Sequence, residues 1–243
     1  MIPKTIHYCW FGRGKKPKLA QKSISSWKKF CQGFEIVEWN EDNFDVAQNQ
    51  YLKNCYERKA WAFLSDYARL LVLEKHGGIY LDTDVEIVRP IDDLLEFDAF
   101  FGFETNERVN TGQGFGAIPN HPAVKAMTKI YQGLFPDANG NFLDVSCPGL
   151  NTQALLPYGL RLDGSRQTVL GAEILPSDFF CPYDDQTGKL NVTDNTYGIH
   201  WYGKSWFRKR DVLRNKLTRP LHRLFGTDFF LFKLVRKMRK QND

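Results

Sequence analysis

Short apolar runs and amphipathic helical patterns alternate along the first part of the chain. Residues 4–11 form an apolar and aromatic run that ends at Gly12 and Gly14, which predicts a strand followed by a loop. A basic helix is expected next, with Pro17 in its first turn. Residues 34–39 then alternate between apolar and polar positions as a second strand. The order strand, helix, strand predicts an α/β domain.

The middle of the chain predicts a long helix that leads into a buried strand. From Arg58 to His76, apolar residues recur at spacings of three and four, and Gly77 with Gly78 forms a carboxy-terminal stop. The stretch IYLDTDVEIV, residues 79–88, begins with continuously apolar residues. Such a run is typical of a central strand that helices cover on both faces.

Further elements are expected toward the carboxy terminus, with no internal repeat or low-complexity tract. Apolar runs occupy residues 99–104 and 114–119, short strands are expected at 173–176 and 197–201, and helices near 121–122 and at 151–156. The whole pattern predicts one α/β domain, residues 1–217, in which helices flank a central mixed sheet. A basic helical tail, residues 218–243, is expected to follow it.

The composition suits a folded domain and excludes several other classes. Of the 243 residues, 42% are apolar and 25% are charged, which is typical of a globular chain. No stretch reaches the roughly 18 consecutive apolar residues of a membrane-spanning helix, and the first residues lack the apolar region of a signal peptide. The five cysteines are scattered and never form C-x-x-C pairs, so we expect reduced thiols and a cytoplasmic location.

The net charge of +5 hides a division between an acidic body and a basic tail. Residues 204–243 contain thirteen Lys/Arg and three Asp/Glu, whereas residues 1–203 carry a net charge of −5. The body lacks the interleaved basic and aromatic residues of a nucleic-acid groove, so nucleic acid is not an expected partner. In the tail, Leu231, Leu234 and Met238 lie on one helical stripe with basic flanks. This stripe predicts either contact with an anionic membrane surface at the inner face of the cell membrane or a helix packed on the domain.

Asp82 and Asp84 are the sharpest local feature. In an extended backbone, positions i and i+2 point to one face, so both carboxylates would converge where the buried strand leaves the core. A hard divalent cation such as Mg²⁺ or Mn²⁺ would offset their repulsion, whereas the alternative is a polar turn after a strand. Asp66 and Arg69, at i and i+3 of the preceding helix, either share a face that leads toward the same sheet edge or form an exposed ion pair.

Four separated segments resemble a known family. They are IPKTIHYCWFG at residues 2–12, SDYARLLVLEKHGGIYLDTDV at 65–85, GFGAIPNHP at 114–122 and IHWYGKSW at 199–206. The chain resembles the DXD-containing sugar transferases of glycosyltransferase family 32 and, more distantly, the catalytic domains of large clostridial glucosylating toxins. This resemblance implies a GT-A fold, which is Rossmann-like, a nucleotide-sugar bound through a divalent cation, and transfer with retention of configuration.

The resemblance also implies roles for the residues around the DXD motif. Asp84 would ligate the metal directly, while Asp82 would contact the ribose or a metal-bound water at the same metal site. Asp66 and Arg69 would reach hydroxyls of the donor sugar or its phosphate. Tyr80 would lie near the donor, and the alternative is a core aromatic whose hydroxyl is satisfied.

Two further segments supply the remaining candidate residues. By resemblance, Trp10 would stack on the nucleobase, and the alternative is an ordinary core tryptophan. His200 would complete the metal shell as a neutral imidazole, although a lone histidine is usually structural. Ser205 and Trp206 would contact the diphosphate of the donor.

The expected function is therefore metal-dependent transfer of a hexose from a nucleotide-sugar, with a UDP-sugar favoured, to a glycan or lipid-linked glycan of a bacterial capsule or surface. This is a glycosyltransferase activity of class EC 2.4. The alternatives are a host-protein-modifying glucosyltransferase, a carboxylate-pair glycosidase and a non-catalytic module that binds nucleotide or carbohydrate. Gly112, Gly114 and Gly116 do not form a phosphate-binding loop pattern, and they are expected on the acceptor side of the cleft.

Overall fold

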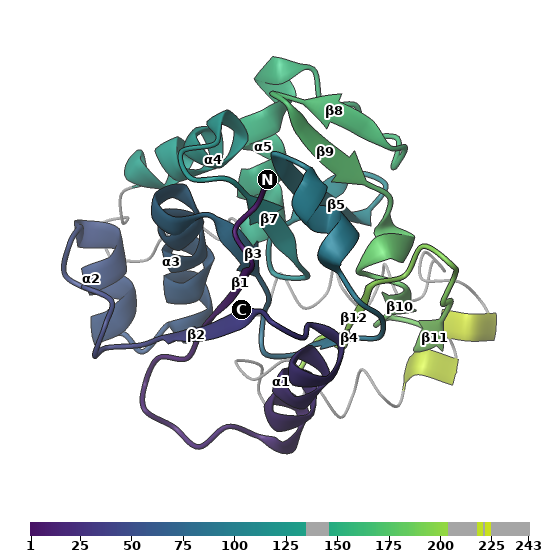
Figure 1. The fold of residues 1–243 in the computed structure, drawn as a ribbon, viewed down its shortest axis with the longest axis horizontal. Coiled ribbons are helices and arrows are strands. Elements are labelled where there is room, and N and C mark those ends of the chain that lie inside the picture. The colour runs from purple at the N-terminus through teal and green to yellow at the C-terminus, as the bar shows by residue number, and fades with distance from the viewer. Residues whose placement is uncertain (135–145, 204–217, 221, 225–243) are drawn as a thin grey trace, which may run out of the picture.

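The computed structural model describes residues 1–134, 146–203, 218–220 and 222–224. Its centre is an eight-stranded sheet in the order β2-β1-β3-β7-β5-β9-β8, with β6 paired to β5 (Figure 1). The helices are α1 (Lys18–Phe30), α2 (Gln50–Glu57), α3 (Trp61–His76), α4 (Pro122–Gln132) and α5 (Cys147–Leu155). The strands of the main sheet are β1 (Thr5–Cys9), β2 (Glu35–Trp39), β3 (Gly78–Tyr80), β5 (Ala99–Thr105), β6 (Arg108–Asn110), β7 (Phe115–Ala117), β8 (Gln167–Val169) and β9 (Ala172–Leu175).

Two small sheets and three short 3₁₀ helices complete the described fold. Strand β4 (Val85–Ile87) pairs with β12 (Gly198–His200), and β10 (Tyr183–Asp184) pairs with β11 (Lys189–Leu190). The 3₁₀ helices are Asp92–Glu96, Leu156–Tyr158 and Ser177–Phe179. In the main sheet β1 runs parallel to β2 and β3, whereas β7 runs antiparallel to β3 and β5. The predicted α/β fold with a mixed sheet is therefore confirmed.

The central strands β3, β5 and β7 bury both of their faces, which explains their continuous apolar runs. On β5, Phe101 and Phe103 point to the core beneath α2, α3, α4 and α5, whereas Phe100 points to the core on the side of α1. On β3, Tyr80 and Ile79 divide between the two cores in the same way. Because successive strand residues face opposite sides, a strand between two layers of helices needs apolar residues at every position.

Helix α3 leads into β3 through two glycines that allow a close approach of the backbone. Gly77 and Gly78 have φ angles of +65° and +99°. A Cβ on Gly78 would lie 2.7 Å from His7 Nε2 and 2.8 Å from the carbonyl oxygen of Thr5 on the adjacent strand. Glycine is therefore required at this position, and it lets α3 deliver its residues directly beside the end of β3.

The structure differs from the sequence-based expectation in the start of one helix and in the backbone that carries Asp82 and Asp84. The helix expected from Arg58 begins at Trp61, because Lys59 has a left-handed φ of 56° that interrupts the helical backbone. The first residues of the stretch 79–88 belong to β3, the central strand that their apolar character predicts, whereas its later residues form β4 in a separate sheet. Between them the N–H of Val85 donates to the carbonyl oxygen of Asp82 at 3.0 Å and closes a turn. Asp82 and Asp84 therefore converge through a turn rather than through extended backbone.

The first residues of the predicted tail contact the β10–β11 hairpin. Arg219 Nη2 lies 3.0 Å from Asp185 Oδ1, and Arg223 Nε donates to the carbonyl oxygen of Thr187 at 2.6 Å. Residues 204–217, 221 and 225–243 lie outside the described residues, and with them the predicted boundary between domain and tail. Among the helices that are described, none has both the length and the apolar character needed to cross a membrane.

Candidate active site

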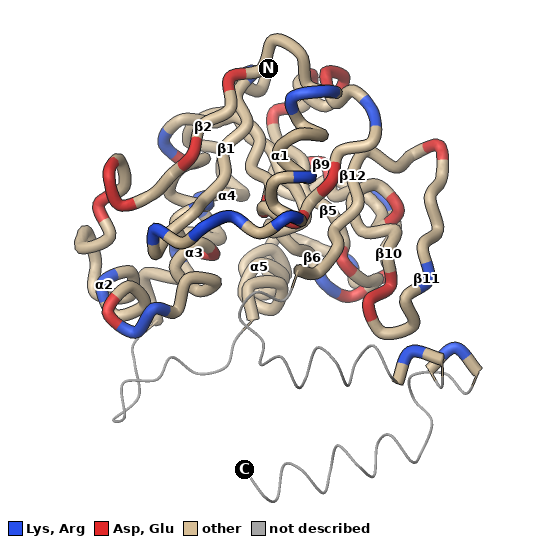
Figure 2. The backbone as a smooth tube through the Cα atoms, turned by 90° about the horizontal axis from the view of Figure 1, so that it is seen from below, with Lys and Arg blue, Asp and Glu red and all other residues tan. Residues whose placement is uncertain are grey.

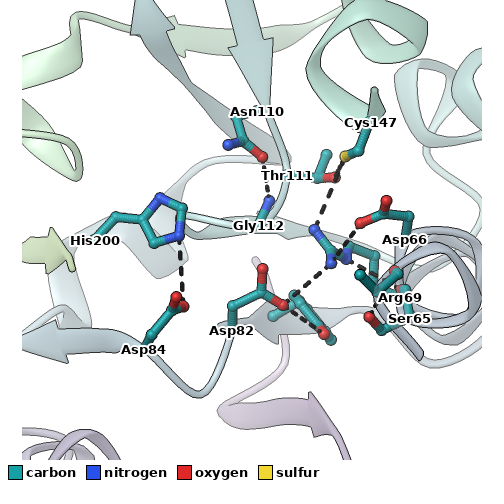
Figure 3. Close-up of polar contacts among 12 residues, drawn as sticks. Ser65, Asp66, Arg69, Asp82, Asp84, Asn110, Thr111, Gly112, Cys147 and His200 are labelled. Carbon is teal, nitrogen blue, oxygen red and sulfur yellow. Dashed lines mark hydrogen bonds and ion pairs between the residues drawn. The ribbon is translucent and has the colours of Figure 1, made fainter. Parts of the chain in front are cut away.

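The candidate site lies where β1 and β3 end, because these parallel strands deliver their following residues to one edge of the sheet. Figure 3 shows Asp82 and Asp84 in the turn after β3, Asp66 and Arg69 on α3, and His200 at the end of β12. One ligand atom from each of Asp82, Asp84 and His200 falls within 4.8 Å of the others. The pairing of β12 with β4, which sets His200 opposite Val85, brings the histidine to this turn.

Asp84 is surrounded by the segment that begins at His200. Its Oδ2 accepts a hydrogen bond from the N–H of Gly203 at 2.6 Å, and its Oδ1 lies 3.4 Å from His200 Nε2. Burial by itself would raise the pKa of Asp84, but His200 and the Gly203 N–H favour the carboxylate, so this pKa lies below its ordinary value. Burial would lower the pKa of His200, but Asp84 raises it well above its ordinary value. The pair is thus electrostatically complementary.

The residues at this point fit a divalent cation. The 3.4 Å between Asp84 Oδ1 and His200 Nε2 is longer than an ordinary hydrogen bond. It approaches the separation of about 3 Å between neighbouring ligands of an octahedral cation with bonds of about 2.1 Å. Asp82 uses only Oδ1 for hydrogen bonds and ion pairs with described residues, so its Oδ2 is left for another partner. Two carboxylates and one imidazole form a reasonable donor set for Mn²⁺ or Mg²⁺.

Arg69 joins α3 to the DXD turn. Its side chain is only 3% exposed, and its Nη2 lies 2.8 Å from Asp66 Oδ1 and 3.1 Å from Asp82 Oδ1. Its Nε donates to the carbonyl oxygen of Ser65 at 3.1 Å, which fixes the guanidinium on its own helix. The hydroxyl of Tyr80 donates to the same Asp82 oxygen at 2.9 Å. Asp66 and Arg69 therefore share a helix face that leads to the DXD turn, and their ion pair is buried rather than exposed.

Burial acts on both carboxyl groups that Arg69 contacts. It raises the pKa of Asp66 to about 6, although Arg69 acts in the opposite direction. It also raises the pKa of Asp82, again against the effect of Arg69. One guanidinium is therefore shared by two carboxyl groups that the protein holds away from water.

Two glycines contact the DXD motif in ways that the sequence did not reveal. The carbonyl oxygen of Gly112 accepts the N–H of Asp82 at 3.1 Å, and a Cβ on Gly112 would lie 2.4 Å from Asp82 Oδ2. Gly114 and Gly116 instead lie against apolar side chains, including Phe180 and Phe100. The other contact is the N–H of Gly203, which binds Asp84 from within the IHWYGKSW segment that the sequence singled out.

Of the remaining candidates, the structure describes Trp10 but not Ser205 or Trp206, which lie outside the described residues. Trp10 follows β1 and is half-buried, and its ring N–H donates to the carbonyl oxygen of Gly14 at 2.7 Å. The ammonium of Lys16 lies 5.5 Å from the centre of a Trp10 ring. Trp10 thus stands at the same sheet edge as the DXD turn rather than in the centre of a core.

Comparison with known proteins agrees with this site at the level of the family. Residues 17–101, which include Asp66, Arg69, Asp82 and Asp84, match the family described as "Glycosyltransferase sugar-binding region containing DXD motif". The resemblance of the chain to the DXD-containing glycosyltransferases is thereby confirmed. This family implies a divalent cation and a nucleotide-sugar donor.

Two curated relatives and one solved structure are similar to this chain. "Uncharacterized glycosyltransferase L373" of Acanthamoeba polyphaga mimivirus is 33% identical over 138 residues, which are 53% of this chain and 55% of the relative. Inositol phosphoceramide mannosyltransferase 1 of Schizosaccharomyces pombe is 25% identical over 130 residues, 50% of this chain and 40% of the relative. The matches thus span about half the length of these relatives or less. PaToxG glycosyltransferase shares the fold, with a TM-score of 0.50 and 21% identity over 64% of this chain and 68% of its own. The expected GT-A-like fold is confirmed.

The raised pKa of Asp66 predicts how stability depends on pH in the metal-free protein. In the unfolded chain this carboxyl loses its proton near pH 4, whereas its pKa of about 6 keeps the proton bound in the folded state. The folded state therefore binds more protons between these values and loses stability as pH rises through them. We expect the free energy of unfolding of the wild type to fall relative to that of Asp66→Asn between about pH 4 and pH 7. Urea unfolding of both proteins measures this difference, and a difference that does not change with pH would contradict the assignment.

Proposed function

We propose that this chain is a metal-dependent retaining glycosyltransferase of class EC 2.4. It moves a hexose from a nucleotide-sugar to a glycan or lipid-linked glycan acceptor in the synthesis of a bacterial capsular or surface polysaccharide. The observation that supports this most strongly is the meeting of Asp82, Asp84 and His200 within 4.8 Å. They lie beside the buried Arg69 in a chain that carries a DXD sugar-binding region.

The proposed chemistry requires the bond between the sugar C1 and the diphosphate oxygen to break. A bound divalent cation would supply positive charge to the departing nucleoside diphosphate. Asp82, Asp84 and His200 would hold this cation, and Mn²⁺ is preferred because an imidazole suits a transition metal better than Mg²⁺. Arg69 keeps Asp82 in place through the 3.1 Å ion pair, while Asp66, on the same guanidinium, would face the hydroxyls of the sugar.

The acceptor hydroxyl would attack C1 on the face from which the diphosphate leaves, and a donor phosphate oxygen would take its proton. No carboxylate of the described site has a position that assigns it as a nucleophile, so this route is preferred to double displacement. A glycosidase that uses Asp82 and Asp84 as its pair is disfavoured, because both groups converge on one point with His200 rather than flanking a sugar. A non-catalytic module would bind the nucleotide without transferring sugar.

The donor is proposed to be a UDP-sugar, with Trp10 stacked on the base. This is supported by the position of Trp10 after β1, at the sheet edge that also carries the DXD turn. Lys16 lies close to its ring and pairs with Glu38 at 2.6 Å, so the base would have charged neighbours as well as an aromatic face. Ser205 and Trp206 are proposed to contact the diphosphate.

A lipid-linked acceptor and the basic tail support each other in this proposal. One relative is named for a mannosyltransferase of a lipid, inositol phosphoceramide. The tail, residues 218–243, would place a cytoplasmic enzyme at the inner face of the membrane through its basic residues. A host-protein acceptor, the main alternative among transferases, would not require this membrane contact.

Replacement of Asp84 tests the cation directly. Asp84→Asn removes one negative charge from the cation site. A bound cation stabilises the charge that develops in the transition state by several kcal/mol, so turnover should fall at least about a hundredfold. The measurement is release of sugar from a panel of UDP- and GDP-sugars with Mn²⁺, with Asp194→Asn on the exposed surface as the matched control. Full activity in a chelator, or wild-type turnover of Asp84→Asn, would refute the cation site, and preference for GDP-sugars would refute the proposed donor.

Trp10→Ala tests the proposed base contact. Stacking of a base on an aromatic side chain contributes about 1–3 kcal/mol, so UDP binding should weaken by that amount. Calorimetry of UDP binding in the presence of Mn²⁺ measures the loss, and urea unfolding shows whether the half-buried side chain also affects the fold. Unchanged UDP affinity would show that Trp10 does not stack on the base and that its role is structural.

The membrane contact is tested by removing the part of the tail that follows Leu224. This truncation keeps Arg219 and Arg223, which bind the β10–β11 hairpin. It removes five Lys/Arg residues. Each of these contributes about 1 kcal/mol to the binding of an anionic membrane surface. Full-length protein should co-sediment with anionic vesicles at low salt and lose this binding at high salt, whereas the truncated protein should not bind. Equal sedimentation of both proteins would argue for a tail that packs on the domain.

A further inference from the structure

Glu104, near the end of β5, contacts both loops that hold the DXD carboxylates. Its Oε1 accepts a hydrogen bond from the hydroxyl of Tyr202 at 3.0 Å and another from Asn110 Nδ2 at 3.2 Å. The side chain is half-buried, and Glu104 lies outside residues 17–101, the region that matches the family. The two partners of Glu104 lead separately to Asp84 and to Asp82.

The first connection runs through Tyr202 to Asp84. Tyr202 has a left-handed φ of 51°, a strained backbone conformation that persists only where the surroundings enforce it. Its hydroxyl lies 2.9 Å from Cys181 Sγ as well as bonding to Glu104, and its ring centre lies 4.2 Å from that of His200. This backbone conformation turns the next N–H, that of Gly203, onto Asp84 Oδ2 at 2.6 Å. Glu104 therefore helps to hold the turn that orients Asp84.

The second connection runs through Asn110 to Asp82. Asn110 Oδ1 accepts the N–H of Gly112 at 2.7 Å (Figure 3), and the carbonyl oxygen of Gly112 accepts the N–H of Asp82 at 3.1 Å. A Cβ on Gly112 would lie only 2.4 Å from Asp82 Oδ2, so this loop is in direct contact with the carboxylate. Movement of Asn110 would therefore be transmitted to Asp82.

We propose that Glu104 is a positioning residue: through Tyr202 and Asn110 it fixes the two DXD carboxylates at the separation at which they bind a divalent cation. One oxygen accepts both hydrogen bonds, so the two loops are coupled, and displacement of either loses a bond at Glu104. Loss of the two hydrogen bonds at Glu104 would leave the Asp82 and Asp84 carboxylates chemically intact, but their positions relative to each other would be less well fixed. The inference rests on the proposed cation site, and it concerns how that site is preorganised.

The test is Mn²⁺ binding to the full chain without nucleotide, measured by calorimetry. Tyr202→Phe removes the hydroxyl and keeps the ring, and Glu104→Ala removes the acceptor. Each should weaken Mn²⁺ affinity by about tenfold, the lower end of the range for groups that orient metal ligands. Glu104→Gln keeps an oxygen acceptor and should retain near wild-type affinity. The double variant Glu104→Ala/Tyr202→Phe should bind Mn²⁺ about as weakly as Glu104→Ala, because Glu104→Ala already removes the bond that Tyr202→Phe breaks, together with the bond to Asn110.

A metal-free measurement separates positioning from general stability. Hydrogen exchange in the segment that contains Gly203 should be faster in Tyr202→Phe than in the wild type, because its N–H loses the orientation toward Asp84. Glu107→Ala, an exposed glutamate in the turn after β5, is the matched control and should change neither exchange nor affinity.

The outcomes distinguish this inference from the proposed function. If the wild type binds no Mn²⁺, or if Asp84→Asn binds it as well as the wild type, the cation site itself is wrong and the inference falls with it. If Asp84→Asn loses Mn²⁺ but Glu104→Ala and Tyr202→Phe bind it normally, the cation site stands and the positioning role is overturned. Loss of turnover in Glu104→Gln at unchanged Mn²⁺ affinity would also overturn it, because Glu104 would then act on the substrate.

Discussion

The electrostatic cost of gathering three carboxyl groups at one sheet edge is the constraint on which the rest of the structure depends. Asp66, Asp82 and Asp84 are each largely shielded from water, and burial opposes the charged form of all three. The protein offsets this cost in two places, with Arg69 between Asp66 and Asp82 and with His200 and the Gly203 N–H around Asp84. A cation bound between Asp82 and Asp84 would add the remaining positive charge, which is why the proposed function follows from the same contacts that stabilise the site.

The scaffold delivers these groups from both sides of the main sheet (Figure 1). Helix α3 lies on one face and contributes Arg69, and Gly77 and Gly78 let it turn straight into β3. On the other face α1 holds β4, because the ring N–H of Trp27 donates to the carbonyl oxygen of Val85 at 2.8 Å. The DXD turn is thus fixed at both ends by buried elements, while its carboxylates remain at the edge, where a substrate can reach them.

The family match and the physical site have different extents. Residues 17–101 contain Asp82, Asp84 and the α3 residues that bind them, but His200, Gly203 and Gly112 come from outside this region. Figure 2 shows the described start of the tail, with its basic residues, beside β10 and β11 and away from helices α2 and α3. The matched region thus supplies the DXD motif and the α3 residues that contact it, and residues after 101 complete the surroundings of the motif.

The sequence by itself determined the features that depend on neighbours along the chain. The continuous apolar runs of β3 and β5, the helical period of α3, the glycines at its end and the i and i+3 spacing of Asp66 and Arg69 are all local features. Only the tertiary structure decided that Asp82 and Asp84 occupy a turn between two sheets, and that Gly112, Glu104 and Tyr202 surround them. The suggestion that His200 joins them came from resemblance alone, and its position beside Asp84 arises from the pairing of β12 with β4. Such contacts join residues far apart in sequence, and their geometry follows from how whole elements pack, which no local spacing encodes.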